Sequence, residues 1–358
     1  MKLHPVLQKI AALLAFAAVT AVLLAACDFL LTDDVHSYSR VMLQELYDQS
    51  RELDTLFLGA SHCYRSVDPA QVDARLGTHS FNAGTSQQQP DGSYYLLKEL
   101  TGRSDLDTVY LEMFYVGYSN EGSSQVPLAC YLITDYLDPL SPNRYAYLME
   151  MGGPAAFADL LMPARHAIGE PGELPALWKA KLSDGYAPGN YSYVTYPDEG
   201  EAYRGRGFVY TRGTPRYGFD TVLNVNADAP LTDFAWTYLE KIADLCEENG
   251  IQLVLFTAPL PSAYADSTAN YQSYLNAVQS FADRRGLSFL DFTLYREIIV
   301  NFEDFCDAHH LNGQGARKFT DALCSVIEAE AAGEAVQDRF FPTLEEKLAA
   351  CPDDTVYH

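Results

Sequence analysis

Three polar residues stand where nucleophilic catalysis could use them, one early in the chain and two near its end. Ser61 follows the apolar run 55–58 and the turn residue Gly59. Such a run predicts a buried strand, and open α/β sheets bind their ligands where strands end. Asp307 and His310 lie three residues apart in a polar loop. This spacing lets His310 act as general base on Ser61 while Asp307 holds its Nδ1 proton.

Each of these residues has competing interpretations. Ser61 could cap the helix that follows it, because serine is a favoured N-cap residue. Cys63 is a second candidate nucleophile, and it could instead form a disulfide with Cys306 in an oxidising exterior. Ser61 is better placed than Cys63, since it comes directly after the strand-end turn.

The histidines near these residues suggest a metal site as a further alternative. His62 adjoins Ser61, and His309 adjoins His310. Adjacent histidines chelate one metal poorly, and the sequence contains no H-E-x-x-H motif. We therefore expect no metal, and we interpret His309 as a solvent-facing neighbour of the base.

The elements that must position these residues alternate between strand and helix. Apolar runs predict five strands, at residues 55–58, 79–82, 108–114, 252–257 and 288–292. Helical patterns lie between and after them, with one opening at Pro69 and others at residues 92–100, 232–249 and 271–285. This alternation predicts an α/β fold, a flavodoxin-like, three-layer, doubly wound parallel sheet.

The domain organisation follows from where that alternation starts, breaks and ends. Residues 36–330 form the predicted catalytic domain. Within it, residues 117–228 carry Pro and Gly clusters and a Tyr-rich stretch, which we interpret as an inserted loop and helical region over the active edge of the sheet. Residues 331–358 form a C-terminal tail with one predicted helix, at residues 343–350.

The N-terminal 35 residues predict a membrane anchor. Residues 10–26 carry no charge and, at about 1.5 Å per residue, span roughly 26 Å as a helix, close to the thickness of a bilayer core. Lys2 and Lys9 precede this run, and Asp33 and Asp34 follow it. Positive residues favour the cytoplasmic side, so we expect the rest of the chain to lie outside the cell membrane.

A lipoprotein signal is the alternative interpretation of residues 1–35. Residues 24–27 read Leu-Ala-Ala-Cys, which is similar to a lipobox, where Cys27 would be lipidated after cleavage. Apolar residues continue to Leu31, whereas the segment after such a cysteine is usually polar, so we favour the uncleaved helix. Both alternatives place the protein at the membrane.

Composition excludes several classes of protein. Hydrophobic residues make up 48% of the 358 residues and charged residues 20%, which is typical of a chain that folds around a core. Lys and Arg total 24 against 48 Asp and Glu, a formal net charge of -24. Such a charge repels phosphate backbones, so we expect no nucleic-acid partner.

The motifs together resemble the SGNH (GDSL-like) hydrolase superfamily. They are similar to its membrane-anchored branch, which includes the D-alanine transfer protein of teichoic acid synthesis and alginate O-acetylation proteins. The resemblance covers roughly residues 55–115 and 250–327, and it is carried by DTLFLGASHCYRSVDP, FNAGTSQQQ and DAHHLNGQGARKFT. It implies that Ser61 is the nucleophile and that Asp307 and His310 complete its triad, with no cofactor.

The resemblance also implies an oxyanion hole, and here the sequence departs from the pattern. The second motif supplies a backbone amide, from Gly84 or Gln87. The third motif normally supplies an Asn, but Glu112 stands in its place in VYLEMFY. A carboxylate cannot stabilise an oxyanion unless it is protonated, and Asn82 could substitute for the missing donor.

The function that follows is a serine esterase or O-acyltransferase outside the cell, acting on an acylated cell-surface carbohydrate or polymer. Hydrolysis and transfer both remain open, and a membrane-bound O-acyltransferase is an expected partner for the second. The missing Asn favours an alternative, a catalytically inactive cell-envelope protein of the same fold that binds a glycan or another protein.

Overall fold

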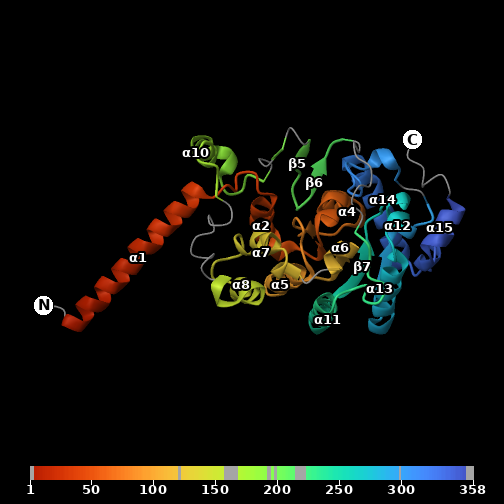
Figure 1. Ribbon diagram of the computed structural model, residues 1–358, viewed down its shortest axis with the longest axis horizontal. Coiled ribbons are helices and arrows are strands. Elements are labelled where there is room, and N and C mark those ends of the chain that lie inside the picture. The colour runs from red at the N-terminus through yellow and green to blue at the C-terminus, as the bar shows by residue number, and fades with distance from the viewer. Residues whose placement is uncertain are drawn as a thin grey trace.

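The computed structural model describes residues 4–119, 122–156, 168–191, 195–196, 200–213, 223–297 and 300–351. Its centre is a sheet of five parallel strands, in the order β2-β1-β3-β7-β8 (Figure 1). Their bounds are Thr55–Leu58 for β1, Ser80–Asn82 for β2, Thr108–Glu112 for β3, Gln252–Thr257 for β7 and Ser288–Asp291 for β8. Counted along the chain, this is the flavodoxin-like order 2-1-3-4-5. The predicted parallel α/β sheet is confirmed.

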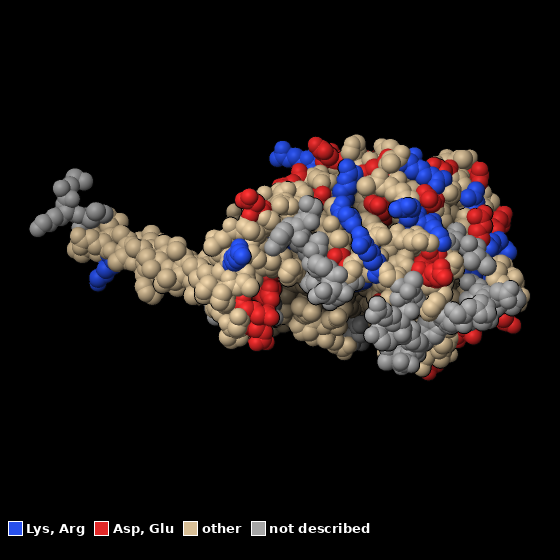
Figure 2. All heavy atoms as spheres, turned by 90° about the horizontal axis from the view of Figure 1, so that it is seen from above, with Lys and Arg blue, Asp and Glu red and all other residues tan. Residues whose placement is uncertain are grey.

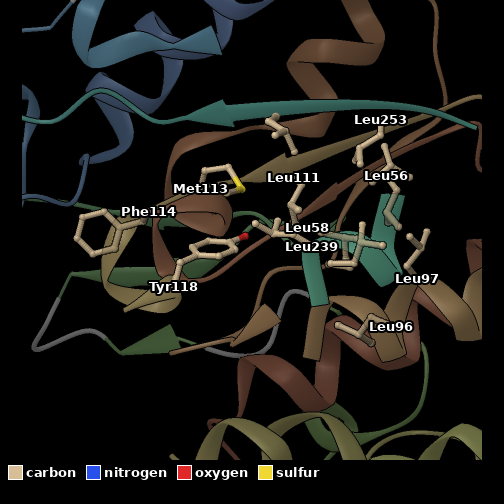
Figure 3. Close-up of a cluster of buried hydrophobic side chains, with 14 of the residues drawn as sticks. Leu56, Leu58, Leu96, Leu97, Leu111, Met113, Phe114, Tyr118, Leu239 and Leu253 are labelled. Carbon is tan, nitrogen blue, oxygen red and sulfur yellow. The ribbon is translucent and has the colours of Figure 1, made fainter. Parts of the chain in front are cut away.

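Helices cover both faces of the sheet because side chains along each strand alternate between them. Leu56 and Leu58 belong to one buried cluster, which Figure 3 shows with side chains from the covering helices, and Phe57 belongs to a second cluster on the other face. The first face is covered by α2 (Tyr38–Gln49), α5 (Pro90–Thr101), α11 (Asp233–Glu248) and α13 (Tyr271–Arg285). The second is covered by α4 (Pro69–Leu76) and α14 (Gly313–Ala331).

The chain between β3 and β7 adds helices and a small second sheet. Its helices are α6 (Tyr115–Tyr118), α7 (Pro127–Thr134), α8 (Pro142–Gly152) and α10 (Leu174–Lys181). Its strands are β4 (Thr195–Tyr196), β5 (Glu201–Tyr203) and β6 (Val209–Thr211), which form an antiparallel sheet that we did not predict.

The loop between β5 and β6 covers the end of the edge strand β2. The backbone amide of Asn82 donates to Arg206 O at 2.9 Å. Gly207 has a positive φ of 83°, and a Cβ there would lie 1.6 Å from Asn82 O, so only glycine allows this approach. The insertion is thereby held against the carboxyl edge of the sheet, where Ser61 was expected.

The N-terminal helix α1 (Pro5–Leu31) projects from the rest of the protein (Figure 1). Its 27 residues have a hydropathy of 2.6 in their most apolar window, and none is buried. Figure 2 shows that the projecting rod carries almost no Lys, Arg, Asp or Glu. Among the described residues it is the one helix long and apolar enough to span a membrane, a test that a signal sequence would also pass.

Helix α10 holds the end of α1 to the domain. Trp178 Nε1 donates to Leu30 O at 2.7 Å, and Lys181 Nζ donates to Phe29 O at 2.7 Å and to Thr32 O at 2.6 Å. Lys181 also pairs with the buried Asp34 at 3.0 Å. Hydrogen bonds and an ion pair therefore fix the junction between the apolar helix and the domain, which is not a flexible linker.

The C-terminal tail packs beside β8. Its last helix, α15 (Leu344–Ala350), begins one residue later than predicted. Lys347 Nζ donates to Thr293 O at 2.6 Å, and Phe340 stacks edge-on against Phe292 just after β8. The tail thus completes the outer side of the sheet.

Candidate active site

The turn after β1 presents Ser61 as the first residue of the short helix α3 (Ser61–Ser66). Gly59 in this turn has φ 153°, and a Cβ there would lie 2.6 Å from Glu112 Cβ and 3.0 Å from Cys63 Cβ. Any larger residue would push the turn off the sheet. Ala60 is the N-cap residue, so Ser61 does not cap the helix and its hydroxyl is free for another partner.

That partner is His310, and the three predicted triad residues lie in one hydrogen-bonded row. Ser61 Oγ lies 2.7 Å from His310 Nε2, and His310 Nδ1 lies 2.7 Å from Asp307 Oδ2. Partial burial would raise the pKa of Asp307, but hydrogen bonds from the His310 ring and from two backbone amides outweigh it and lower that pKa. Asp307 is therefore ionised at neutral pH and able to orient His310.

The loop that carries Asp307 and His310 is locked to the start of α14. Asn312 caps α14 by accepting from the amides of Gln314 and Gly315, each at 3.0 Å. Its Nδ2 donates to Glu303 O and to Gly213 O, each at 2.7 Å, so the same side chain ties the loop and the insertion to the helix. His310 is thus held in place by the capped helix and by the insertion, not by its own loop alone.

Two further imidazoles support the row. His62 Nε2 lies 3.0 Å from His309 Nδ1, and the His62 ring stacks on Phe114 at 3.6 Å and on His310 at 4.4 Å between centroids. Burial lowers the pKa of His62 well below its usual value and that of His309 to about 4, with the nearby charge of His310 adding to both effects. Both rings are neutral at pH 7. His309 is thus a packed neighbour of the base, not the solvent-facing one expected.

These three imidazoles are also the one group among the described residues that could hold a metal ion, with their nitrogens within 4.8 Å. Both nitrogens of His310 already face Ser61 and Asp307, and His62 and His309 bond to each other. A metal would have to displace these bonds. A site without metal stays our prediction.

The structure changes the set of groups that could donate hydrogen bonds to an oxyanion. Asn82 Nδ2 donates to Cys63 O at 2.9 Å and to Val67 O at 3.1 Å, so neither of its protons is left for a substrate. We therefore remove Asn82 as a donor, because its amide instead fixes the end of α3. The Gly84 amide donates to Asn82 Oδ1 at 3.2 Å. Of the two amides considered in that loop, Gln87, with φ 55° and an exposed side chain, remains the candidate.

Glu112, which replaces the expected Asn, lies beneath the turn. It is 2% exposed, and its Oε2 lies 3.4 Å from where a Gly59 Cβ would be. Burial raises its pKa to about 8, although the amides of Phe114 and Ala258 bond to the carboxyl. Glu112 is therefore mostly protonated at pH 7, and its burial assigns it to support of the turn rather than to substrate contact.

Replacing Glu112 by Gln should flatten the pH dependence of stability. A carboxyl whose folded pKa, about 8, exceeds its ordinary value of 4.5 stabilises the fold at low pH and loses that contribution as pH rises between these values. At about 1.4 kcal/mol per pKa unit, the wild type should lose roughly 4 kcal/mol of unfolding free energy between pH 5 and 9. The Glu112→Gln variant should not show this decrease in unfolding free energy, because its amide does not titrate.

Urea unfolding in detergent at pH 5 and pH 9 checks this expectation. The exposed Glu248 on α11 offers a control, since Glu248→Gln should follow the wild type. Equal losses for wild type and Glu112→Gln would mean that Glu112 is ionised in the fold.

The alternative nucleophile is poorly suited to attack. Cys63 is fully buried, and burial raises the pKa of its thiol well above the usual value, so no reactive thiolate forms at neutral pH. All seven cysteines lie in the described residues and are free thiols, so Cys63 and Cys306 are not bonded. Cys306 instead faces Arg65 Nη1 at 3.7 Å.

Comparisons with known proteins add little to this geometry. One family model, which carries no functional description, matches residues 223–332, less than half of the chain. No curated protein matches. Among solved structures, the chain is similar to a GDSL-like lipase from Bacteroides thetaiotaomicron, with 10% sequence identity and a TM-score of 0.36, over 81% of this chain and 98% of that one. A likeness this distant carries no conclusion about activity.

Proposed function

We propose that this protein is a membrane-tethered serine esterase or O-acyltransferase of the SGNH type, facing the outside of the cell. Its substrate would be an acylated cell-surface carbohydrate or polymer. The observation that carries the proposal is the row from Ser61 through His310 to Asp307, with both links at 2.7 Å, at the carboxyl edge of a parallel sheet. Ligands bind at this edge in open α/β folds.

The proposed reaction runs in two halves. Ser61 Oγ attacks the ester carbonyl carbon while His310 Nε2 takes its proton, and Asp307 stabilises the imidazolium that forms. The tetrahedral intermediate collapses, the alcohol leaves with the proton from His310, and an acyl-serine remains. Water or a sugar hydroxyl then gives its proton to His310 and attacks the acyl carbon. As the bond to Ser61 Oγ breaks, His310 returns this proton to Ser61, and the acid or the new ester leaves. No step uses a cofactor.

Neutral neighbours favour this role for His310. A cation beside the forming imidazolium would oppose proton transfer from Ser61, and the low pKa of His62 and of His309 keeps both of these rings uncharged. The incomplete oxyanion hole opposes the role, since each missing donor costs roughly 2.7–4 kcal/mol of transition-state stabilisation. The non-catalytic envelope protein is therefore the second candidate.

Hydrolysis of p-nitrophenyl acetate by the full chain in detergent separates the two candidates. The enzyme should release nitrophenolate faster than its Ser61→Ala variant, which should keep the fold because the exchange only removes the hydroxyl of a half-buried residue. Equal rates for the two proteins would refute the esterase and leave the binding protein.

We also propose that α1 stays in place as a single membrane anchor. The helix continues unbroken through the exposed Cys27 to Leu31, and its end is bonded to α10. Intact mass of the membrane-extracted protein tests this: we expect residues 1–26 to be present and Cys27 unmodified. A product that begins at a diacylglyceryl Cys27 would establish the lipoprotein instead.

A further inference from the structure

A cavity of about 520 Å³ lies between the catalytic turn and the end of α1. One end is lined by Tyr64 and Arg65 of α3 and by Gly84. The other end is lined by residues that follow α1 directly, among them Asp33 and Tyr38. Its size lies within the range of small-molecule sites.

The catalytic end of this cavity is adjacent to Ser61. Arg65 lies four residues after Ser61, so the two share one face of α3 about 6 Å apart along its axis. A Cβ on Gly84 would lie 3.0 Å from Gly59 O and 3.1 Å from Ala60 O, which places Gly84 against the turn that presents Ser61. The cavity therefore adjoins the turn and the helix that carry Ser61, although Ser61 itself is not among its lining residues.

The wall of the cavity combines aromatic, aliphatic, hydroxyl and acidic side chains. Five tyrosines contribute to it, and Ser37, Ser39, Thr85 and Ser86 also line it. Tyrosine offers an apolar ring face together with a hydroxyl, which suits the alternating faces and hydroxyls of a sugar. Met42, Leu128, Leu132 and Val209 add aliphatic surface to the wall, against which the apolar face of a sugar ring could also pack.

The charged side chains that line the cavity indicate which ligands it can accept. The lining carries the carboxylates of Asp33, Asp135 and Glu201 against one guanidinium, that of Arg65. Arg65 forms an ion pair with Glu201, and its Nη1 donates to Thr211 Oγ1 at 3.1 Å. The wall is thus net negative, and its one arginine is already neutralised. An anionic ligand would meet repulsion rather than a cation.

We propose that this cavity binds the saccharide on which the protein acts, and that it accepts neutral sugars and amino sugars but rejects anionic ones such as uronates. The inference rests on the proposed function for its chemistry, since it identifies the substrate class of the Ser61 site. Binding itself does not depend on catalysis. The position beside the end of α1 adds that the sugar is bound close to the membrane surface.

The test is a binding measurement on the full-chain Ser61→Ala variant in nanodiscs of zwitterionic lipid. Four probes are compared by calorimetry: cellotetraose as the neutral sugar, chitosan tetramer as the cationic one, tetragalacturonate as the anionic one, and tetralysine as a cationic peptide. We expect the first two to bind and tetragalacturonate to bind at least roughly tenfold more weakly than either, as one or two like charges nearby dictate.

A charge reversal assigns the binding to the cavity. Asp33→Lys, at an exposed lining residue, should weaken the chitosan tetramer roughly tenfold and leave cellotetraose nearly unchanged. Glu248→Lys makes the same change of net charge on the outer surface of α11 and should alter neither. Equal losses from both variants would place the binding elsewhere and overturn the proposal.

Three further outcomes of the binding measurement would contradict the proposal. Tetragalacturonate binding as tightly as the other sugars, tetralysine alone binding, or no probe binding would each overturn the sugar site. Hydrolysis of p-nitrophenyl acetate reports separately on the enzyme. Sugar binding without hydrolysis would refute the esterase activity but support the saccharide site. Hydrolysis without sugar binding would support the esterase activity but refute the saccharide site.

Discussion

Replacing His310 by Ala should reduce the hydrolysis of an activated acetyl ester to the background rate. Its Nε2 lies 2.7 Å from Ser61 Oγ, and no other described base is bonded to that hydroxyl. Loss of the base in a serine triad lowers kcat by about 10⁶-fold. Initial rates with p-nitrophenyl acetate measure the effect, and thermal unfolding checks that the variant is folded.

His309→Ala is the matched control, because it removes the adjacent imidazole from the same loop. His309 contacts His62 rather than Ser61, so its loss should act through positioning and cost at most about 100-fold in rate. It should also lower stability by about 1–3 kcal/mol, since His62 Nε2 loses its partner in a buried site. An inactive His309→Ala beside an active His310→Ala would show that the base is assigned one residue too late.

Asp307→Asn should lower the rate by about 10⁴-fold, the size of the same exchange in serine proteases. The reason lies in the two oxygens of Asp307. Oδ1 accepts from the backbone amides of His309 at 3.0 Å and His310 at 2.8 Å, while Oδ2 faces His310 Nδ1. In the Asn variant, the two amides keep the carbonyl oxygen at the first position. The amide nitrogen must then face Nδ1, and His310 takes the tautomer with its proton on Nε2.

That tautomer points a proton at Ser61 and cannot accept one, so the loss should appear in kcat. Stability should change little, because the two backbone hydrogen bonds remain. Steady-state kinetics with an acetyl ester separates kcat from KM. A variant that keeps its kcat, or that loses activity only through unfolding, would exclude Asp307 as the residue that orients the base.

Much of the fold could be predicted because its signals are local. The five strands begin within one residue and end within two of the predicted positions, since each is a short apolar run that both faces of a parallel sheet bury. Ser61 could be placed at the carboxyl edge of the sheet because Gly59 and the strand before it stand next to it in the sequence. The contact between Asp307 and His310 could be predicted because both residues lie in one loop.

The remainder depends on contacts between distant segments. The antiparallel sheet of β4, β5 and β6 was not predicted, since its strands are two or three residues long and carry no readable period. Asn82 was offered as an oxyanion donor because nothing near it in the sequence reveals that α3 takes both of its amide protons. The position of His62 beside Ser61 was a visible signal, but its stacking partner Phe114 comes from the end of β3.

Labelling of Ser61 by a fluorophosphonate probe tests the central claim most directly, because such probes react only with an activated serine. The full chain in detergent is treated with the probe at pH 7.5, digested, and mapped by mass spectrometry. We predict one modified residue, Ser61, with labelling abolished in both Ser61→Ala and His310→Ala. Absence of labelling in the wild type, or equal labelling of Ser61→Ala, would contradict the account of this site as a serine esterase or acyltransferase.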